Sequence, residues 1–121
     1  MAVFYIGSYD IVDPTEFQKY PPLVLALLPK YGGVVLASDT TAHLVEGTMR
    51  TMNAIIRFPS KEAALGLYND PAYQEAKRIR QASTRNVSMV LVDEYVANGC
   101  TCPILYPLGP DVKLMIDTFA R

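Results

Sequence analysis

The stretch of residues 53–74 constrains the fold of this chain more than any other. It begins with an apolar, β-branched run that ends at Phe58, which is typical of a strand. Ser60 can cap a following helix, and Asp70 with Pro71 at the first helical position predicts that a second helix starts after a break. This pattern indicates a small α+β domain whose helices cover a sheet.

A first helix is expected near the N-terminus. Asp13 can cap it, Pro14 suits its first position, and Glu16 completes the spacing of a capping box. The prolines at 21 and 22 predict a disturbance, after which the helix resumes to residue 28. Gly32 then allows a left-handed stop.

Strands complete the predicted domain. They are expected over residues 3–9, 34–37, about 49–58 and 87–92, where β-branched and aromatic residues gather. The order of elements is therefore βαββαβ, which is the ferredoxin-like pattern.

A sheet covered by helices on one face leaves its other face bare. Monomers rarely expose a large apolar patch, so we expect two copies to pair sheet to sheet, as a homodimer or a higher homo-oligomer. The residues expected on this face are Phe4, Ile6, Ile55, Val90 and Val92.

Composition excludes several classes of partner. The 121 residues carry a net charge of −1, with no run of Lys or Arg, so a nucleic-acid surface is not expected. No apolar segment has the roughly 18 residues of a membrane span, and no basic region precedes the apolar N-terminus, as an export signal requires. A cytoplasmic protein is the expectation.

Residues 96–121 extend beyond the predicted domain of residues 1–95. Two strands around residues 109–111 would make a hairpin or a swapped arm there. Cys100 and Cys102 lie too close for an unstrained disulfide. Two thiols and one histidine also fall short of the four ligands of a structural zinc site, unless a dimer supplies the rest. No metal or other cofactor is expected.

Several short motifs, in this order and spacing, resemble the DUF1330 family of the dimeric α+β barrel superfamily. They are Tyr5, Asp13-Pro14, Phe17, Tyr20, Tyr31-Gly32-Gly33, Val45-Glu46-Gly47, Phe58-Pro59-Ser60, Ala63-Ala64, Tyr68-Asn69-Asp70-Pro71-Ala72-Tyr73-Gln74 and Arg80. The resemblance implies a dimeric α+β barrel with a pocket between sheet and helices in each subunit. Superfamily members include cofactor-free monooxygenases, lactone isomerases, polyketide cyclases, dehydratases and haem enzymes. The apolar residues 21–29 and the extension after residue 95 depart from the family pattern.

Two residues are candidate proton-transfer groups. His43 is the only histidine and lies near Glu46 in sequence, which suits general acid–base catalysis, although a solvated loop histidine would look the same. Glu46 matches the Glu-Gly of the family. It could be a buried base with a raised pKa, or it could pair with Arg50 or Arg57 beside a turn shaped by Gly47.

Arg80 is the candidate for substrate binding. It follows Tyr73 by seven residues, so both lie on one helix face, which Ile79 marks as the buried face. A buried arginine is costly unless it is paired. Either a carboxylate such as Glu46 neutralises it, or it binds an anionic group of a substrate.

Four further residues are expected at the pocket. The hydroxyls of Tyr5, Tyr68 and Tyr73 would line an otherwise apolar cavity suited to a small ligand, unless these rings are ordinary core aromatics. Asn53 is polar within an apolar strand, so it lines the pocket or faces the dimer seam.

These residues indicate a cofactor-independent enzyme that acts by proton transfer on a small organic or polyketide-like molecule. The reaction would be an isomerisation, cyclisation, hydration or hydrolysis, with Glu46 or His43 as the base. Two alternatives remain open. One is a dimer that binds a small molecule without catalysis, and the other is a structural dimer with no ligand.

Overall fold

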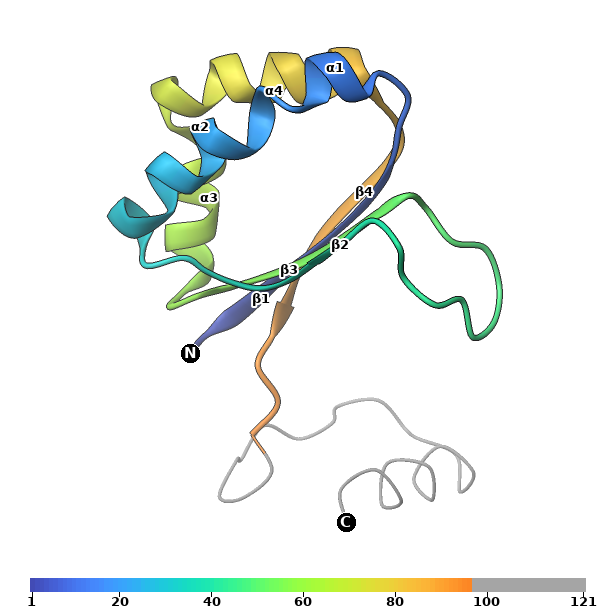
Figure 1. The fold of residues 1–121 in the computed structure, drawn as a ribbon. Helices are drawn as coiled ribbons and strands as arrows, with labels where there is room; N and C mark the ends of the chain where they lie inside the picture. The colour runs from blue at the N-terminus through green and yellow to red at the C-terminus, as the bar shows by residue number, and fades with distance from the viewer. Residues whose placement is uncertain (97–121) are drawn as a thin grey trace, which may run out of the picture.

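A computed structural model describes residues 1–96 of the chain (Figure 1). Its strands are β1 (Val3–Ile11), β2 (Val34–Asp39), β3 (Met52–Phe58) and β4 (Thr84–Asp93). Its helices are α1 (Pro14–Phe17), α2 (Tyr20–Leu27), the 3-10 helix η1 (Leu28–Tyr31), α3 (Lys61–Asn69) and α4 (Pro71–Ser83). The two strands predicted in the C-terminal extension, and both cysteines, lie outside the described residues.

The four strands form one antiparallel sheet in the order β2-β3-β1-β4. All helices lie on one face of this sheet, as Figure 1 shows. This topology confirms the predicted ferredoxin-like α+β fold. Within residues 1–96, no helix combines the length and the apolarity needed to cross a bilayer.

The predicted helix starts are confirmed by their caps. The carboxylates of Asp13 and Asp70 and the hydroxyl of Ser60 each accept a hydrogen bond from a backbone N–H in the first turn, at 2.8 to 3.1 Å. The capping box predicted at Glu16 is incomplete, because its side chain accepts a bond from Lys19 Nζ at 2.8 Å instead of reaching back. The backbone N–H of Asp13 donates to the carbonyl of Ser83.

The break in the first helical region was predicted at the wrong place. The helix stops after Phe17 and restarts at Tyr20, so that Pro21 and Pro22 occupy the first turn of α2. Proline is tolerated there because the N–H groups of a first turn have no partner within the helix. Gly32, with a φ of 68°, provides the predicted left-handed stop.

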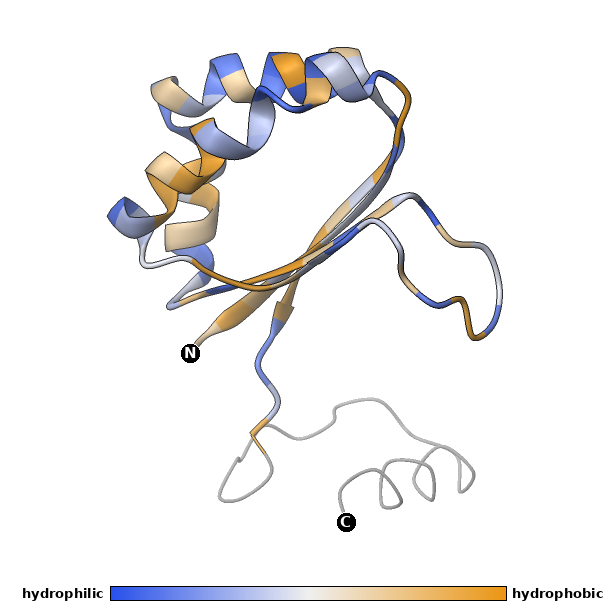
Figure 2. Ribbon diagram, in the orientation of Figure 1, coloured by the Kyte–Doolittle hydropathy of each residue, from blue (hydrophilic) through white to orange (hydrophobic). Residues whose placement is uncertain are grey.

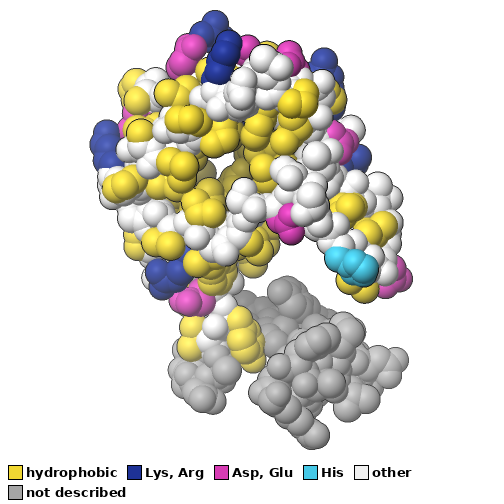
Figure 3. All heavy atoms as spheres, in the orientation of Figure 1, with side chains coloured by type: hydrophobic (Ala, Val, Ile, Leu, Met, Phe, Trp, Pro, Cys, Tyr) yellow, Lys and Arg dark blue, Asp and Glu magenta, His cyan; other side chains and the backbone are white. Residues whose placement is uncertain are grey.

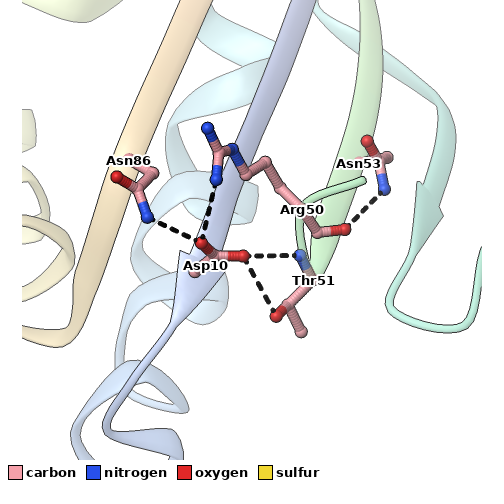
Figure 4. A network of polar contacts seen from close by, with 5 residues as sticks. All are labelled: Asp10, Arg50, Thr51, Asn53 and Asn86. Carbon is pink, nitrogen blue, oxygen red and sulfur yellow. Dashed lines mark hydrogen bonds and ion pairs between the residues drawn. The ribbon is translucent and has the colours of Figure 1, made fainter. Parts of the chain in front are cut away.

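The third strand is shorter than predicted, because a polar network holds its start (Figure 4). Asp10 on β1 accepts hydrogen bonds from the backbone of Thr51 at 3.1 Å and from Asn86 Nδ2 at 2.9 Å, and Arg50 Nη1 lies 3.5 Å away. The bonds from Asn86 and Thr51 lower the pKa of Asp10. These contacts tie the loop of residues 40–51 to β1 and β4, so β3 begins only at Met52.

Alternation along the strands gives the sheet two different faces. Val3, Tyr5 and Tyr9 of β1 pack into the core beneath the helices. Figure 2 shows apolar residues along the strands and on α2. The opposite face has no cover within the described residues and includes exposed Ile6, Val90 and Val92, as predicted.

Asp70 joins the helices at the break between α3 and α4. Its side chain accepts hydrogen bonds from the Tyr31 hydroxyl, from the Ala72 backbone at 2.8 Å and from Lys30 Nζ at 3.0 Å. These bonds, that from Tyr31 above all, lower the pKa of Asp70 to about 2.

We therefore expect Asp70→Asn to make the stability of the fold depend less on pH in the acidic range. The wild-type carboxylate stabilises the fold above the unfolded-state pKa of roughly 3.9, and this contribution disappears as the pH falls through about 2. Near neutral pH the variant should melt about 5 °C lower, and the difference should vanish near pH 2. Thermal unfolding followed by circular dichroism measures both. Asp13→Asn, at the cap of α1, is the control. An undiminished difference in acid would contradict the role of the Asp70 charge.

Candidate functional site

A cavity of about 660 Å³ lies between the helix-covered face of the sheet and the helices. This size is within the range typical of small-molecule sites. Its lining is mostly apolar, and among the described residues it includes no charged side chain. Figure 3, which views the sheet from its edge, shows a hollow between the sheet and the helices, surrounded by hydrophobic side chains.

The sheet side of the cavity carries Ala54 of β3 and the ring of Tyr5, which lies over Gly7 of β1. Gly7 of β1 pairs with Ala54 of β3 in the sheet register. A Cβ atom at Gly7 would overlap the phenol ring of Tyr5, so only glycine lets this ring lie along β1. The ring therefore turns over the sheet and contributes to the lining.

The mouth of the cavity is apolar. Leu25 of α2, Leu65 of α3 and Val35 of β2 all line the cavity, yet they remain 56%, 42% and 39% exposed. Tyr68 is also partly exposed and lies under Lys77, whose Nζ is 4.0 Å from the ring centroid. A ligand would therefore enter between α2, α3 and β2 along hydrophobic side chains.

Tyrosine hydroxyls supply most of the polar groups of the cavity. Tyr20 Oη and Tyr73 Oη are hydrogen-bonded at 2.7 Å, and both side chains are buried. The rings of Tyr68 and Tyr73 are in contact, with their centroids 5.7 Å apart. Tyr5, Tyr9 and these three tyrosines all belong to the lining. The predicted residues Tyr5, Tyr68 and Tyr73 are thus brought together here.

Three of these hydroxyls, those of Tyr5, Tyr9 and Tyr20, have a raised pKa and stay protonated at neutral pH. Burial raises the pKa of Tyr9 to about 12, although the charge of Arg80 acts against it. Burial also raises the pKa of Tyr5 and of Tyr20 well above the usual tyrosine value. The cluster therefore offers hydrogen-bond donors to a ligand and has little tendency to accept a proton.

Arg80 of α4 lies behind this cluster and is only 3% exposed. Burial acts to lower the pKa of Arg80, but the nearby hydroxyls of Tyr73 and Tyr20 outweigh it and keep the pKa above its usual value. Its Nε has no hydrogen-bond partner within residues 1–96. The guanidinium is thus a buried, fully charged group next to the tyrosines.

Of the two partners suggested for Arg80, the Glu46 carboxylate is not found beside it. In the part of the chain that the structure describes, the ion pairs involve other cations, and none includes either residue. The physical reason is the path of the loop of residues 40–51. It projects beyond the sheet, away from α4, and is held there by Asp10 (Figures 1 and 4).

His43 and Glu46 lie in this loop and do not reach the tyrosine cavity. Both are exposed in this chain, so the burial expected for Glu46 is not found. They line a separate depression of about 340 Å³ together with Ser8, Arg50 and Asn53. Figure 3 shows the histidine on a projection apart from the hollow. Their catalytic roles remain predictions.

Asn53 faces away from the helices, on the same side as this depression. Its Nδ2 donates to the backbone carbonyl of Arg50 at 3.2 Å. Of the two positions predicted for Asn53, the structure places it on the open face and not in the tyrosine cavity.

Sequence reasoning gave no role to Tyr9 and Tyr20, which the structure adds to the cluster. Tyr9 follows Tyr5 by four residues in a strand, so period-two alternation puts both on one face. Tyr20 carried no comparable signal, because its position depends on the restart of the helix after Phe17. Residues 1–96 contain no cluster of three or more His, Cys, Asp or Glu side chains placed to hold a metal ion.

A family model described as "Domain of unknown function (DUF1330)" matches residues 2–95. The chain belongs to the DUF1330 family. A search of curated proteins found no match. The family resemblance seen in the sequence is therefore confirmed, and the matched region contains every residue of the cavity.

Solved structures share the fold at low sequence identity. RPA0582, a protein of unknown function from Rhodopseudomonas palustris, has a TM-score of 0.68 at 16% identity, over 79% of this chain and 84% of that one. A dimeric ferredoxin-like protein of unknown function from Jannaschia sp. CCS1 has a TM-score of 0.66 at 14% identity, over 78% and 100%. SnoaB, a cofactor-independent oxygenase from Streptomyces nogalater, has a TM-score of 0.59 at 11% identity, over 81% and 97%.

Proposed function

We propose that this DUF1330 protein is a homodimeric, cofactor-independent enzyme that acts on a small organic or polyketide-like molecule in the cavity between sheet and helices. One observation carries the proposal. A largely apolar cavity of about 660 Å³ presents a cluster of tyrosine hydroxyls with a charged, buried Arg80 next to it. A core that served only to stabilise the fold would be filled by side chains.

The cluster suits reactions that pass through an oxyanion. Hydroxyl groups held in place, with a positive charge near them, stabilise negative charge on an enolate or phenolate oxygen in a water-poor cavity. Tyr20 and Tyr73 are already fixed by their mutual hydrogen bond, so they need no rearrangement when the charge develops. Isomerisation, cyclisation, hydration and hydrolysis of activated carbonyl compounds all gain from such stabilisation.

The apolar face of the sheet supports the homodimer. Ile6 pairs with Ile55 on one side and with Val90 on the other, so that an apolar row crosses three strands. Ile6 and Val90 are 40% and 48% exposed in the single chain. Two solved structures that share this fold, from Jannaschia sp. CCS1 and Bacteroides fragilis, are described as dimeric and ferredoxin-like.

Native mass spectrometry of gently purified protein tests the proposal. We expect a dimer that carries a small organic molecule, which unfolding releases. The released molecule is then added back in excess to emptied, refolded protein. Conversion of more than one molecule per subunit supports catalysis. An empty dimer that also fails to convert candidate aromatic and polyketide-like compounds would contradict the proposed enzyme.

A second candidate function is binding without catalysis. Among the described residues, the cavity lining includes no carboxylate and no imidazole, which are the usual proton acceptors. In the same experiment, a bound molecule recovered unchanged after repeated incubation would favour this candidate over the enzyme.

A further inference from the structure

The charges around the cavity are unbalanced. Arg80 is only 3% exposed, and its buried Nε has no hydrogen-bond partner within residues 1–96. The carboxylates that form ion pairs in this region pair with Lys19, Lys30, Arg50, Arg57 and Arg78. A buried charge without a counter-charge is costly, which indicates that an anion from outside the described chain completes the site.

A second copy of the chain is poorly placed to supply this anion. Arg80 lies on the helix-covered side of the sheet, among Tyr20 and Tyr73. The proposed dimer buries the opposite face, around Ile6 and Val90. The cavity, in contrast, borders the tyrosines that surround the guanidinium, so an occupant of the cavity is the natural source of negative charge.

The number of hydroxyl hydrogens in the tyrosine pair also indicates that the cavity binds an anionic group. Tyr20 and Tyr73 have one hydroxyl hydrogen each, and one of these is used in the 2.7 Å bond between them. The other hydrogen remains for a further acceptor. Because burial also raises the pKa of Tyr5, its hydroxyl is a third protonated group at this end. A cluster of donors beside a cation fits an anionic oxygen and repels a cationic group.

The rest of the cavity lining favours a ligand that is apolar apart from its anionic group. Val24, Leu28, Ile56, Met89 and Leu91 line it with hydrocarbon, and its mouth is apolar as well. A second charge on the ligand would lie against these side chains without a partner. The site therefore suits a molecule whose polar group is confined to one end.

We propose that the ligand is an apolar, ring-sized molecule with a single negatively charged oxygen group, held with that group at Tyr20 and Tyr73 and neutralised by Arg80. This inference rests on the proposed function and names its substrate class. The anionic group is a carboxylate or the ionised form of an acidic enol, which both carry negative charge on an oxygen that accepts hydrogen bonds.

Isothermal titration calorimetry with three probes of similar size tests this inference near neutral pH. Naphthoate carries a carboxylate, hydroxynaphthoquinone is an ionised enol, and naphthalenemethanol is the neutral counterpart. Wild-type protein should bind at least one anion about tenfold more tightly than the alcohol. The anion with the larger advantage identifies the source of the charge.

Variants assign the preference to Arg80. Arg80→Met should reduce the advantage of the anion to less than about threefold, and Arg80→Lys, which keeps the charge, should preserve part of it. Arg78→Met, on the exposed side of the same helix, should bind like the wild type. If Arg80→Met fails to fold, the wild-type comparison of anion and alcohol still decides.

Three results would overturn the inference. They are equal binding of anion and alcohol by the wild type, an advantage that survives in Arg80→Met, and a neutral molecule found bound after purification. Each of them leaves the proposed function standing. Failure of all three probes to bind also overturns the inference, and it overturns the proposed function only when the purified protein is empty and inactive as well.

Discussion

Ile6→Glu should convert the proposed homodimer into monomers. Ile6 lies at the centre of the open face, paired with Ile55 and Val90, so each copy would bring a carboxylate into a buried apolar contact. An unpaired charge at the centre of an interface should weaken dimerisation by about a thousandfold. Sedimentation velocity over a concentration series measures the shift.

A matched variant separates this effect from general surface charge. Val12→Glu adds the same group at a residue that is 53% exposed, just beyond the end of β1. It should dimerise like the wild type. Persistence of the Ile6→Glu dimer at unchanged affinity would mean that another surface joins the copies, and a wild-type monomer at all concentrations would contradict the homodimer.

Ala54→Phe should abolish ligand binding without loss of stability. Ala54 lines the cavity, and a phenyl ring at residue 54 would project into it and occupy part of its volume. Binding of the co-purifying molecule should weaken by at least about a hundredfold, because the ring and the ligand compete for one volume. The free energy of unfolding should rise by about 1 kcal/mol through the added apolar burial.

Two measurements on the same sample check this pair of effects. Calorimetric titration gives the affinity, and urea unfolding gives the stability. Ala82→Phe, at an exposed residue of α4, is the control and should change neither by much. Unchanged ligand binding by Ala54→Phe would show that the ligand lies elsewhere, and a large drop in stability would show that the cavity has no room for the ring.

Local signals in the sequence were sufficient to predict most of the fold. The caps at Asp13, Ser60 and Asp70 depend on residues two or three positions away, and the structure confirms all three. Errors arose where distant contacts decide. The start of β3 depends on Asp10, which lies about forty residues before Thr51 in the chain and hydrogen-bonds to it.

For the candidate site, too, residues whose positions follow from local spacing could be predicted, and contacts between distant segments could not. The structure places Tyr5 and Tyr73 at the cavity, and alternation along a strand and spacing along a helix face account for both positions. The partner of Arg80 could not be read in this way. Glu46 was suspected as its partner, but the course of a twelve-residue loop, residues 40–51, is set by hydrogen bonds to β1 and β4 that no local pattern encodes.

The alternation of β1 also has an evolutionary consequence. Tyr5 and Gly7 shape the cavity, whereas Phe4 and Ile6, their immediate neighbours in the chain, point to the opposite face. Selection can therefore act on odd-numbered positions of this strand to reshape the cavity, while even-numbered positions preserve the apolar face of the proposed homodimer. Gene duplicates with this fold can therefore change the cavity through one set of positions in β1 and keep the opposite face through the other set.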